Sequence, residues 1–121
     1  MIRSHKDLKV WQRAMDLVVE SYRLAKCLPT TERYELASQI RRAAVSVPAN
    51  IAEGHGRDHL GDYLHSLSVA NGSLMELETH FLIASRLSYF NPADLELAMT
   101  MVDEVGRMLS GLTRKLKDAR T

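Results

Sequence analysis

Residues 91–117 read NPADLELAMTMVDEVGRMLSGLTRKLK, and this stretch decides the fold class. Asn91 suits the cap of a helix, Pro92 suits the first helical position, and Asp94 places an acid in the first turn. The apolar residues that follow recur at alternating steps of three and four, as in helices that pack at a shallow angle. They are Leu95, Ala98, Val102, Val105, Leu109, Leu112 and Leu116. The stretch therefore predicts a long amphipathic helix over residues 92–117.

Three further helices are predicted upstream, because apolar residues recur there at the helical period. The first spans about residues 8–28 and ends before Pro29, which disfavours a helical residue in front of it. The second spans about residues 32–54. The third spans about residues 58–88, with Asp58 as its expected cap.

The second helix carries the main irregularities of the pattern. Thr30 or Thr31 is the expected cap, and Gly54-His55-Gly56 supplies the stop and turn. Pro48 removes one backbone donor and presses its ring on the preceding turn. The apolar spacing nevertheless continues in register to Ile51, so we expect one helix kinked at Pro48 rather than two helices.

Three short connections would thus join four long helices within residues 1–121. Short connections place consecutive helices antiparallel to each other. We therefore expect a single all-α domain, folded as an up-down-up-down antiparallel four-helix bundle.

Composition narrows the class of protein further. A lone cysteine, Cys27, excludes a disulfide or a cysteine-based zinc site within one chain, and it is interpreted as a small hydrophobe near a helix end. No run of 18 apolar residues is present, and no apolar segment follows the first residues. We expect a cytoplasmic protein without a membrane partner.

The small net charge of +1 conceals an uneven distribution. Residues 1–13 and 111–121 together carry a net charge of +6, whereas the rest of the chain carries −5. In the expected topology both ends of the chain lie beside the turn between the second and third helices. A positive end of this kind attracts nucleic acid. The candidate contact residues are Lys6, Lys9, Arg13, Arg57, Arg114, Lys115 and Lys117. The alternative is that these basic residues only complement helix dipoles.

Several apolar residues lie beside the helical stripes rather than on them. They are Val10, Val19, Leu82, Ile83, Leu97, Met101 and Met108. They either widen the core, since bundle helices use about three positions in seven, or form a subunit interface. We expect a homo-oligomer, because monomers seldom expose so much apolar surface.

The second and third helices also carry a polar set, with several members spaced three or four residues apart. The set comprises Arg41, Arg42, Ser46, Asn50, Glu53 and Glu76. An arginine–carboxylate pair between the two helices would fix their register. A network between helices or subunits is favoured over a ligand site that uses the two arginines.

Three segments resemble a known family, namely residues 38–54, residues 72–79 (GSLMELET) and residues 7–11 (DLKVW). The sequence is similar to the "four helix bundle protein" family, which includes proteins encoded in 23S rRNA intervening sequences. The resemblance implies a bundle that assembles into a homopentameric ring. Related accessory variability determinants of diversity-generating retroelements are basic pentamers that bind nucleic acid and a reverse transcriptase, whereas this chain has a low net charge.

Catalytic motifs are absent from the sequence. A di-iron bundle needs Glu-x-x-His on two helices, and that pattern does not occur. Glu76 and His80 lie one turn apart and could ligate a metal only with help from another helix. We therefore expect no catalytic residue, metal or cofactor, and a non-enzymatic module that binds RNA, DNA or a nucleic-acid-processing partner through its basic end. A protein-only assembly scaffold with a protein partner is the main alternative, and a metal-dependent enzyme is a remote one.

Overall fold

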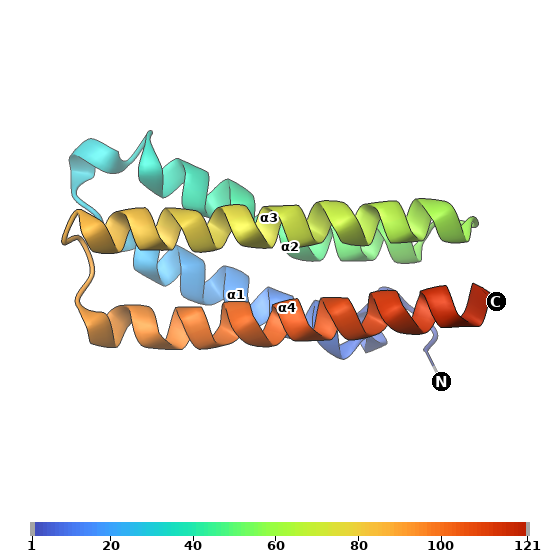
Figure 1. Ribbon diagram of the computed structural model, residues 1–121. Coiled ribbons are helices and arrows are strands. Elements are labelled where there is room, and N and C mark those ends of the chain that lie inside the picture. Colours follow the sequence, from blue (N-terminus) through green and yellow to red (C-terminus); the bar gives the residue numbers. More distant parts are fainter. Residues whose placement is uncertain (1, 121) are drawn as a thin grey trace.

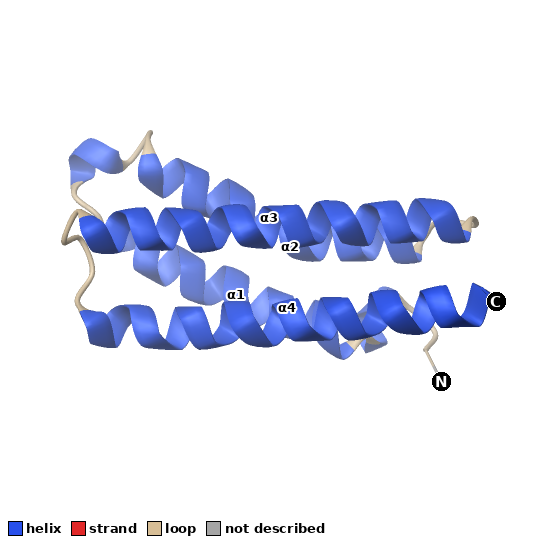
Figure 2. Cartoon of the chain, in the orientation of Figure 1, coloured by secondary structure: helices blue, strands red, loops and turns tan. Residues whose placement is uncertain are grey.

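The computed structural model describes the backbone of residues 2–120 and the side chains of residues 2–119. Its four α-helices are α1 (Lys9–Lys26), α2 (Leu36–His55), α3 (Leu60–Arg86) and α4 (Pro92–Arg120). Figure 1 shows these helices running along the length of the molecule. Two short 3-10 turns, η1 (His5–Asp7) and η2 (Thr30–Glu32), precede α1 and α2. No strand occurs in residues 2–120 (Figure 2), so the predicted all-α class is confirmed.

Each helix packs against two neighbours in a square arrangement. Helix α1 lies beside α2 and α4, and α3 lies beside the same two helices. Figure 1 places both chain ends and the α2–α3 turn at one end of the molecule, with the other two turns at the opposite end. This arrangement confirms the predicted up-down-up-down bundle.

Helix α4 follows its predicted heptad seam closely. Ala98, Val102, Val105 and Leu109 are buried, while Leu95, Leu112 and Leu116 are partly buried against the core. The other helices complete this core with Leu17 and Leu24 from α1, Ile40, Val47 and Ile51 from α2, and Leu67, Leu74, Leu77 and Phe81 from α3. Burial of these side chains is the main stabilising contribution, at about 1.5–3 kcal/mol for each large one.

Helix α2 ends within the predicted stop Gly54-His55-Gly56, with His55 as its last residue and Gly56 as its C-cap, although Gly54 itself is still helical. Gly54 is buried, and a Cβ atom added to it would lie 2.7 Å from the Cβ atom of Ser66 on α3. The glycine therefore serves the close approach of two helices rather than the end of one.

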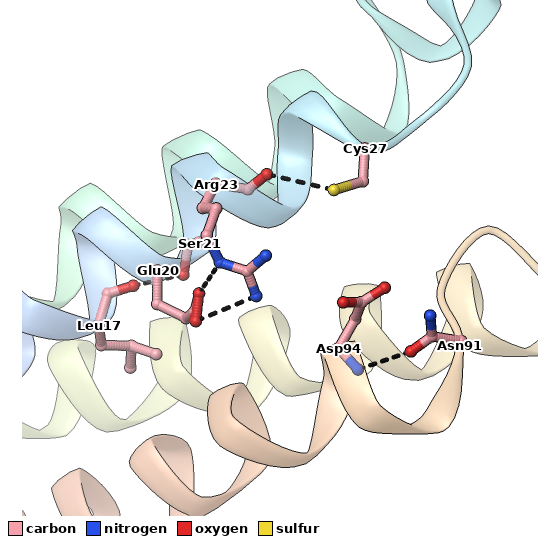
Figure 3. Close-up of polar contacts among 7 residues, drawn as sticks. All are labelled: Leu17, Glu20, Ser21, Arg23, Cys27, Asn91 and Asp94. Carbon is pink, nitrogen blue, oxygen red and sulfur yellow. Dashed lines mark hydrogen bonds and ion pairs between the residues drawn. The ribbon is translucent and has the colours of Figure 1, made fainter.

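The helix starts were predicted with mixed success. The Asn91 side chain accepts a hydrogen bond of 2.8 Å from the Asp94 amide (Figure 3), which confirms the cap of α4. Neither threonine caps α2, because both lie in η2 and the carboxylate of Glu32 instead accepts a bond of 3.4 Å from the Leu36 amide. The N-cap of α3 is His59 rather than Asp58, and its side chain makes no capping bond.

Pro48 is buried inside α2, which extends without interruption from Leu36 to His55. The single helix agrees with the sequence pattern. The kink at Pro48 stays a prediction.

The end of α1 lies at the opposite end of the bundle from the two chain ends (Figure 1). Buried Glu20 forms an ion pair with Arg23, and its hydrogen bonds raise the pKa of the arginine. The Ser21 hydroxyl donates a bond of 2.7 Å to the Leu17 carbonyl.

The Cys27 thiol is exposed and lies 3.5 Å from the Arg23 carbonyl. The cysteine was predicted as a small hydrophobe, and its exposure contradicts a role in the core.

Candidate nucleic-acid interface

Five of the predicted basic residues are exposed and form no ion pair with any residue that the structure describes. They are Lys6, Lys9, Arg114, Lys115 and Lys117, which we call the basic pole. They come from η1, the first turn of α1 and the last turns of α4. These segments lie at the end of the bundle that holds both chain ends (Figure 1).

The other two predicted residues are paired with carboxylates. Arg13 donates bonds of 2.9 Å to Glu104 and 3.0 Å to Asp16, and these hydrogen bonds raise the pKa of its guanidinium group. Arg57 donates a bond of 2.7 Å to Glu53, which raises its pKa in the same way. Both arginines therefore offer less uncompensated charge to a polyanion than the basic pole does.

An ordered turn holds Lys6 in place. The Asp7 carboxylate accepts hydrogen bonds from the amides of Arg3 (2.8 Å) and Ser4 (3.2 Å), while the Ser4 hydroxyl accepts one of 3.0 Å from the Lys6 amide. The two backbone hydrogen bonds lower the pKa of Asp7, and nearby His55 adds a smaller effect. This capping box escaped the sequence analysis, although serine followed three residues later by an acid is a recognisable signal.

The lysines of α1 and α4 border a small apolar hollow. Lys9 and Lys115 contribute to its lining, together with Leu8, Val10, Met108, Gly111 and Leu112. The hollow has a volume of about 300 Å³. It brings together two basic residues that lie far apart in the sequence.

Arg114 and Lys117 face the other side of α4 and line a larger hollow against α3. We call this the α3–α4 hollow, and its volume is about 650 Å³. Its lining is completed by Gly61, Leu64, His65, Leu67, Ser68, Asn71, Leu109, Ser110 and Thr113. None of the described residues that line it carries a carboxylate. The basic pole is therefore divided between two faces of the last turns of α4.

The predicted polar set is only partly a network between helices. Ser46 and Ser73 share a hydrogen bond of 2.8 Å that joins α2 to α3, and the Asn50 amide donates one of 3.0 Å to the Ser46 hydroxyl. Arg41 instead donates to the Arg33 carbonyl at 3.2 Å, and Arg42 is exposed.

Each carboxylate of this polar set instead contacts a residue four positions further along the chain. Glu53 binds Arg57, and Glu76 lies 3.4 Å from the His80 ring. Across the described residues, no arginine–carboxylate pair joins α2 to α3, so that expectation is wrong. Hydroxyl groups of two small serines make the link instead, since these helices are close enough for short side chains to meet.

Glu76 and His80 lie one helical turn apart on α3. No group of three or more histidine, cysteine, aspartate or glutamate residues is clustered suitably for a metal within the described part of the chain. The His80 side chain is buried, and its Nδ1 atom has no hydrogen-bond partner there. Among the described residues, this pair has no third ligand beside it.

The surplus apolar residues fall into two groups. Val10 and Met101 are buried and Met108 is partly buried, so these three widen the core. The others remain exposed, namely Val19, Leu82, Ile83 and Leu97. The apolar stripe that bundle helices need explains the first group.

Within the described residues, none of the helices combines the length and the apolar character that crossing a membrane requires.

The fold and its charged end define this chain as a small antiparallel four-helix-bundle protein with a basic end. It belongs to the 23S rRNA-intervening sequence protein family, whose model matches residues 6–111. A solved structure of similar fold is a protein of unknown function from the S23 ribosomal protein family of Bacteroides thetaiotaomicron. The TM-score is 0.81 and the identity 22%, and the match covers 87% of this chain and 95% of that one. Comparison with curated proteins gives no significant match.

Proposed function

We propose that this chain is a non-enzymatic, oligomeric binding module that contacts nucleic acid through its basic pole. The observation that supports the proposal is the set of five exposed cations at one end, none of which has an ion-pair partner among the described residues. Unpaired cations gain more from phosphate than arginines that already bind carboxylates, because no existing ion pair has to break.

Oligomerisation would strengthen this interaction. An open hollow of about 480 Å³ between α1 and α2 is lined by Tyr22, Ser38, Arg41, Arg42, Val45 and Ser46. Tyr22 and Val45 are exposed, and Val19 on α1 is 72% exposed. Apolar and arginine side chains of this kind are typical of subunit interfaces. The resemblance to pentameric proteins makes a homopentamer the specific expectation, and a ring with aligned basic poles would multiply their field.

The binding proposal is tested by electrophoretic mobility shift with duplex and single-stranded nucleic acid at rising salt. We expect the logarithm of the binding constant to fall linearly with the logarithm of the salt concentration, because binding releases cations from the phosphates. The double variant Lys115→Glu, Lys117→Glu should weaken binding to all sequences alike. The double variant Lys26→Glu, Arg33→Glu changes the net charge equally at the opposite end and is the matched control. Absence of binding at low salt would refute the proposal.

A protein-only assembly scaffold is the second candidate, favoured by exposed Leu82 and Ile83 on α3. Apolar side chains that are adjacent in sequence and both exposed are suited to a protein partner. Capture of a partner that survives nuclease treatment, and that is lost in Leu82→Lys, would favour this candidate. Capture that nuclease abolishes would support the nucleic-acid proposal.

A further inference from the structure

The α3–α4 hollow is built differently from an ordinary charged surface. Leu67 and Leu109, which are 1% and 2% exposed, contribute to its lining. Ser68, Asn71 and Ser110 add hydrogen-bonding groups, and Arg114 and Lys117 add positive charge. A volume of about 650 Å³ lies within the range of ligand pockets, which runs from about 300 to 1,000 Å³.

The charge in this region changes along the groove between α3 and α4. A second hollow of about 520 Å³ shares Asn71, Ser110 and Arg114 with the first, but Glu78 and Asp103 also line it. Asp103 forms an ion pair with Arg107, while Arg114 has no such partner among the described residues. An anionic ligand is therefore favoured next to Arg114 and Lys117 and disfavoured farther along the groove.

We propose that the α3–α4 hollow binds one nucleotide unit, with its phosphate at Arg114 and Lys117 and its base against the half-buried side chain of Leu64. This inference rests on the proposed function and specifies the ligand as single-stranded nucleic acid. A duplex keeps its bases stacked and paired, whereas a single strand can present a base to a hollow. Arginine suits the phosphate because its planar group can form two parallel hydrogen bonds.

Two adjacent residues of α4 provide the matched test. Arg114 lines the α3–α4 hollow, whereas Lys115 lines the hollow on the α1 side. Arg114→Glu and Lys115→Glu change the net charge equally, so long-range attraction falls alike in both. We expect Arg114→Glu to lower the affinity for a labelled oligouridylate about tenfold or more below that of Lys115→Glu, as measured by fluorescence anisotropy. Equal losses would overturn the assignment of this hollow.

Two glycines of α3 test the hollow without changing any charge. Gly61 lines it and Gly72 does not, and a Cβ atom added to either would meet no atom within 4 Å. Gly61→Leu should fill part of the hollow and weaken binding of the oligouridylate severalfold, whereas Gly72→Leu should leave binding unchanged. Both changes should preserve the fold because leucine favours a helix more than glycine does. Equal affinities of the two variants would contradict the proposal.

Three probes distinguish a single strand, a duplex and a free nucleotide as the ligand of the hollow. They are the oligouridylate, a duplex of equal length and free uridine monophosphate. Preference for the single strand over the duplex supports the proposal. Binding of free uridine monophosphate without binding of either oligonucleotide would assign the hollow to small nucleotides instead of a strand. If the duplex bound more tightly and Arg114→Glu and Lys115→Glu lowered its affinity equally, binding in the hollow would be refuted. The proposed contact through the basic pole would stand. No binding of any probe would refute both.

Discussion

Gly54 and Gly72 differ sharply in what surrounds their α-carbons. A Cβ atom at Gly54 would lie 2.7 Å from Ser66 and 3.0 Å from the Tyr63 ring, but one at Gly72 would meet nothing within 4 Å. Gly54 lies where α2 and α3 pack tightly against each other, whereas Gly72 lies on an open face of α3. Neither their identity nor their local sequence reveals that difference.

The first prediction follows from this contrast. Gly54→Ala should lower the free energy of unfolding by about 1–3 kcal/mol, because the extra methyl group overpacks the α2–α3 contact. Gly72→Ala should raise it by about 0.5–1 kcal/mol through better helix propensity. Urea unfolding followed by circular dichroism measures both. A stabilising Gly54→Ala would show that α2 and α3 are farther apart than described.

The second prediction concerns the Asp7 carboxyl group. Backbone hydrogen bonds from Arg3 and Ser4 lower its pKa below the ordinary value of 3.8. The charged group therefore stabilises η1 above that value, and the contribution is lost as pH falls through the lower pKa of the folded state. In nuclear magnetic resonance spectra, the amide signals of Arg3 and Ser4 should titrate with a midpoint below 3.8.

The control for this titration is Asp7→Asn, which keeps an acceptor oxygen but removes the charge. The amide signals of Arg3 and Ser4 should then lose their acid titration. A midpoint at or above the ordinary value in the unmodified protein would contradict the capping box.

Among the helices, the turn between α3 and α4 holds one unusual backbone conformation. Ser88 has a φ of 64°, in the left-handed region that favours glycine. The next amide, that of Tyr89, donates a bond of 2.9 Å to the Ala84 carbonyl and so closes the end of α3. This ending follows the glycine-type pattern of helix ends, with serine at the position where glycine is usual.

The third prediction uses this turn. Ser88→Gly should raise the free energy of unfolding by about 0.5–1 kcal/mol, since glycine adopts the required conformation without strain. Ser85→Gly, inside α3, is the matched control and should lower it by a similar amount. Thermal unfolding distinguishes them by opposite shifts of Tm. A destabilising Ser88→Gly would mean that the serine side chain contributes more than its backbone strain costs.

The sequence predicted each helix and its stripe best where the signals were local. Asn91 and Pro92 marked the start of α4 correctly, because capping and proline geometry depend on neighbouring residues. The start of α2 was misplaced because the Leu36 amide donates to the Glu32 carboxylate. The nearby threonines, which are common helix caps, had suggested an earlier start. The close helix contact at Gly54 was not foreseen, because it depends on Ser66, a residue of another helix.

Across the whole molecule, topology was predictable and pairing was not. Short connections between long helices sufficed to bring Lys9 and Lys115 to one end. That Arg13 binds Glu104, a residue 91 positions away, depends on side-chain geometry after folding and leaves no trace in composition or spacing. The basic pole was therefore foreseen in outline, whereas its division into two hollows required the structure.

The fourth prediction concerns assembly. Val19→Lys should reduce the mass measured by light scattering toward that of a single chain, because it places a charge on the exposed apolar surface of α1. Leu97→Lys, on α4, is a matched control that should not change the mass. A monomeric unmodified protein would contradict the proposed oligomer. Dissociation caused only by Leu97→Lys would place the interface elsewhere.

The location of Cys27 determines how this protein can be labelled or immobilised. It is the only cysteine of the chain, its thiol is exposed, and it follows α1 at the end of the bundle remote from the basic pole. A tag fused to either terminus would project beside the residues that we expect to touch phosphate. A maleimide dye or biotin on Cys27 would instead leave that region unobstructed for fluorescence and surface-capture assays.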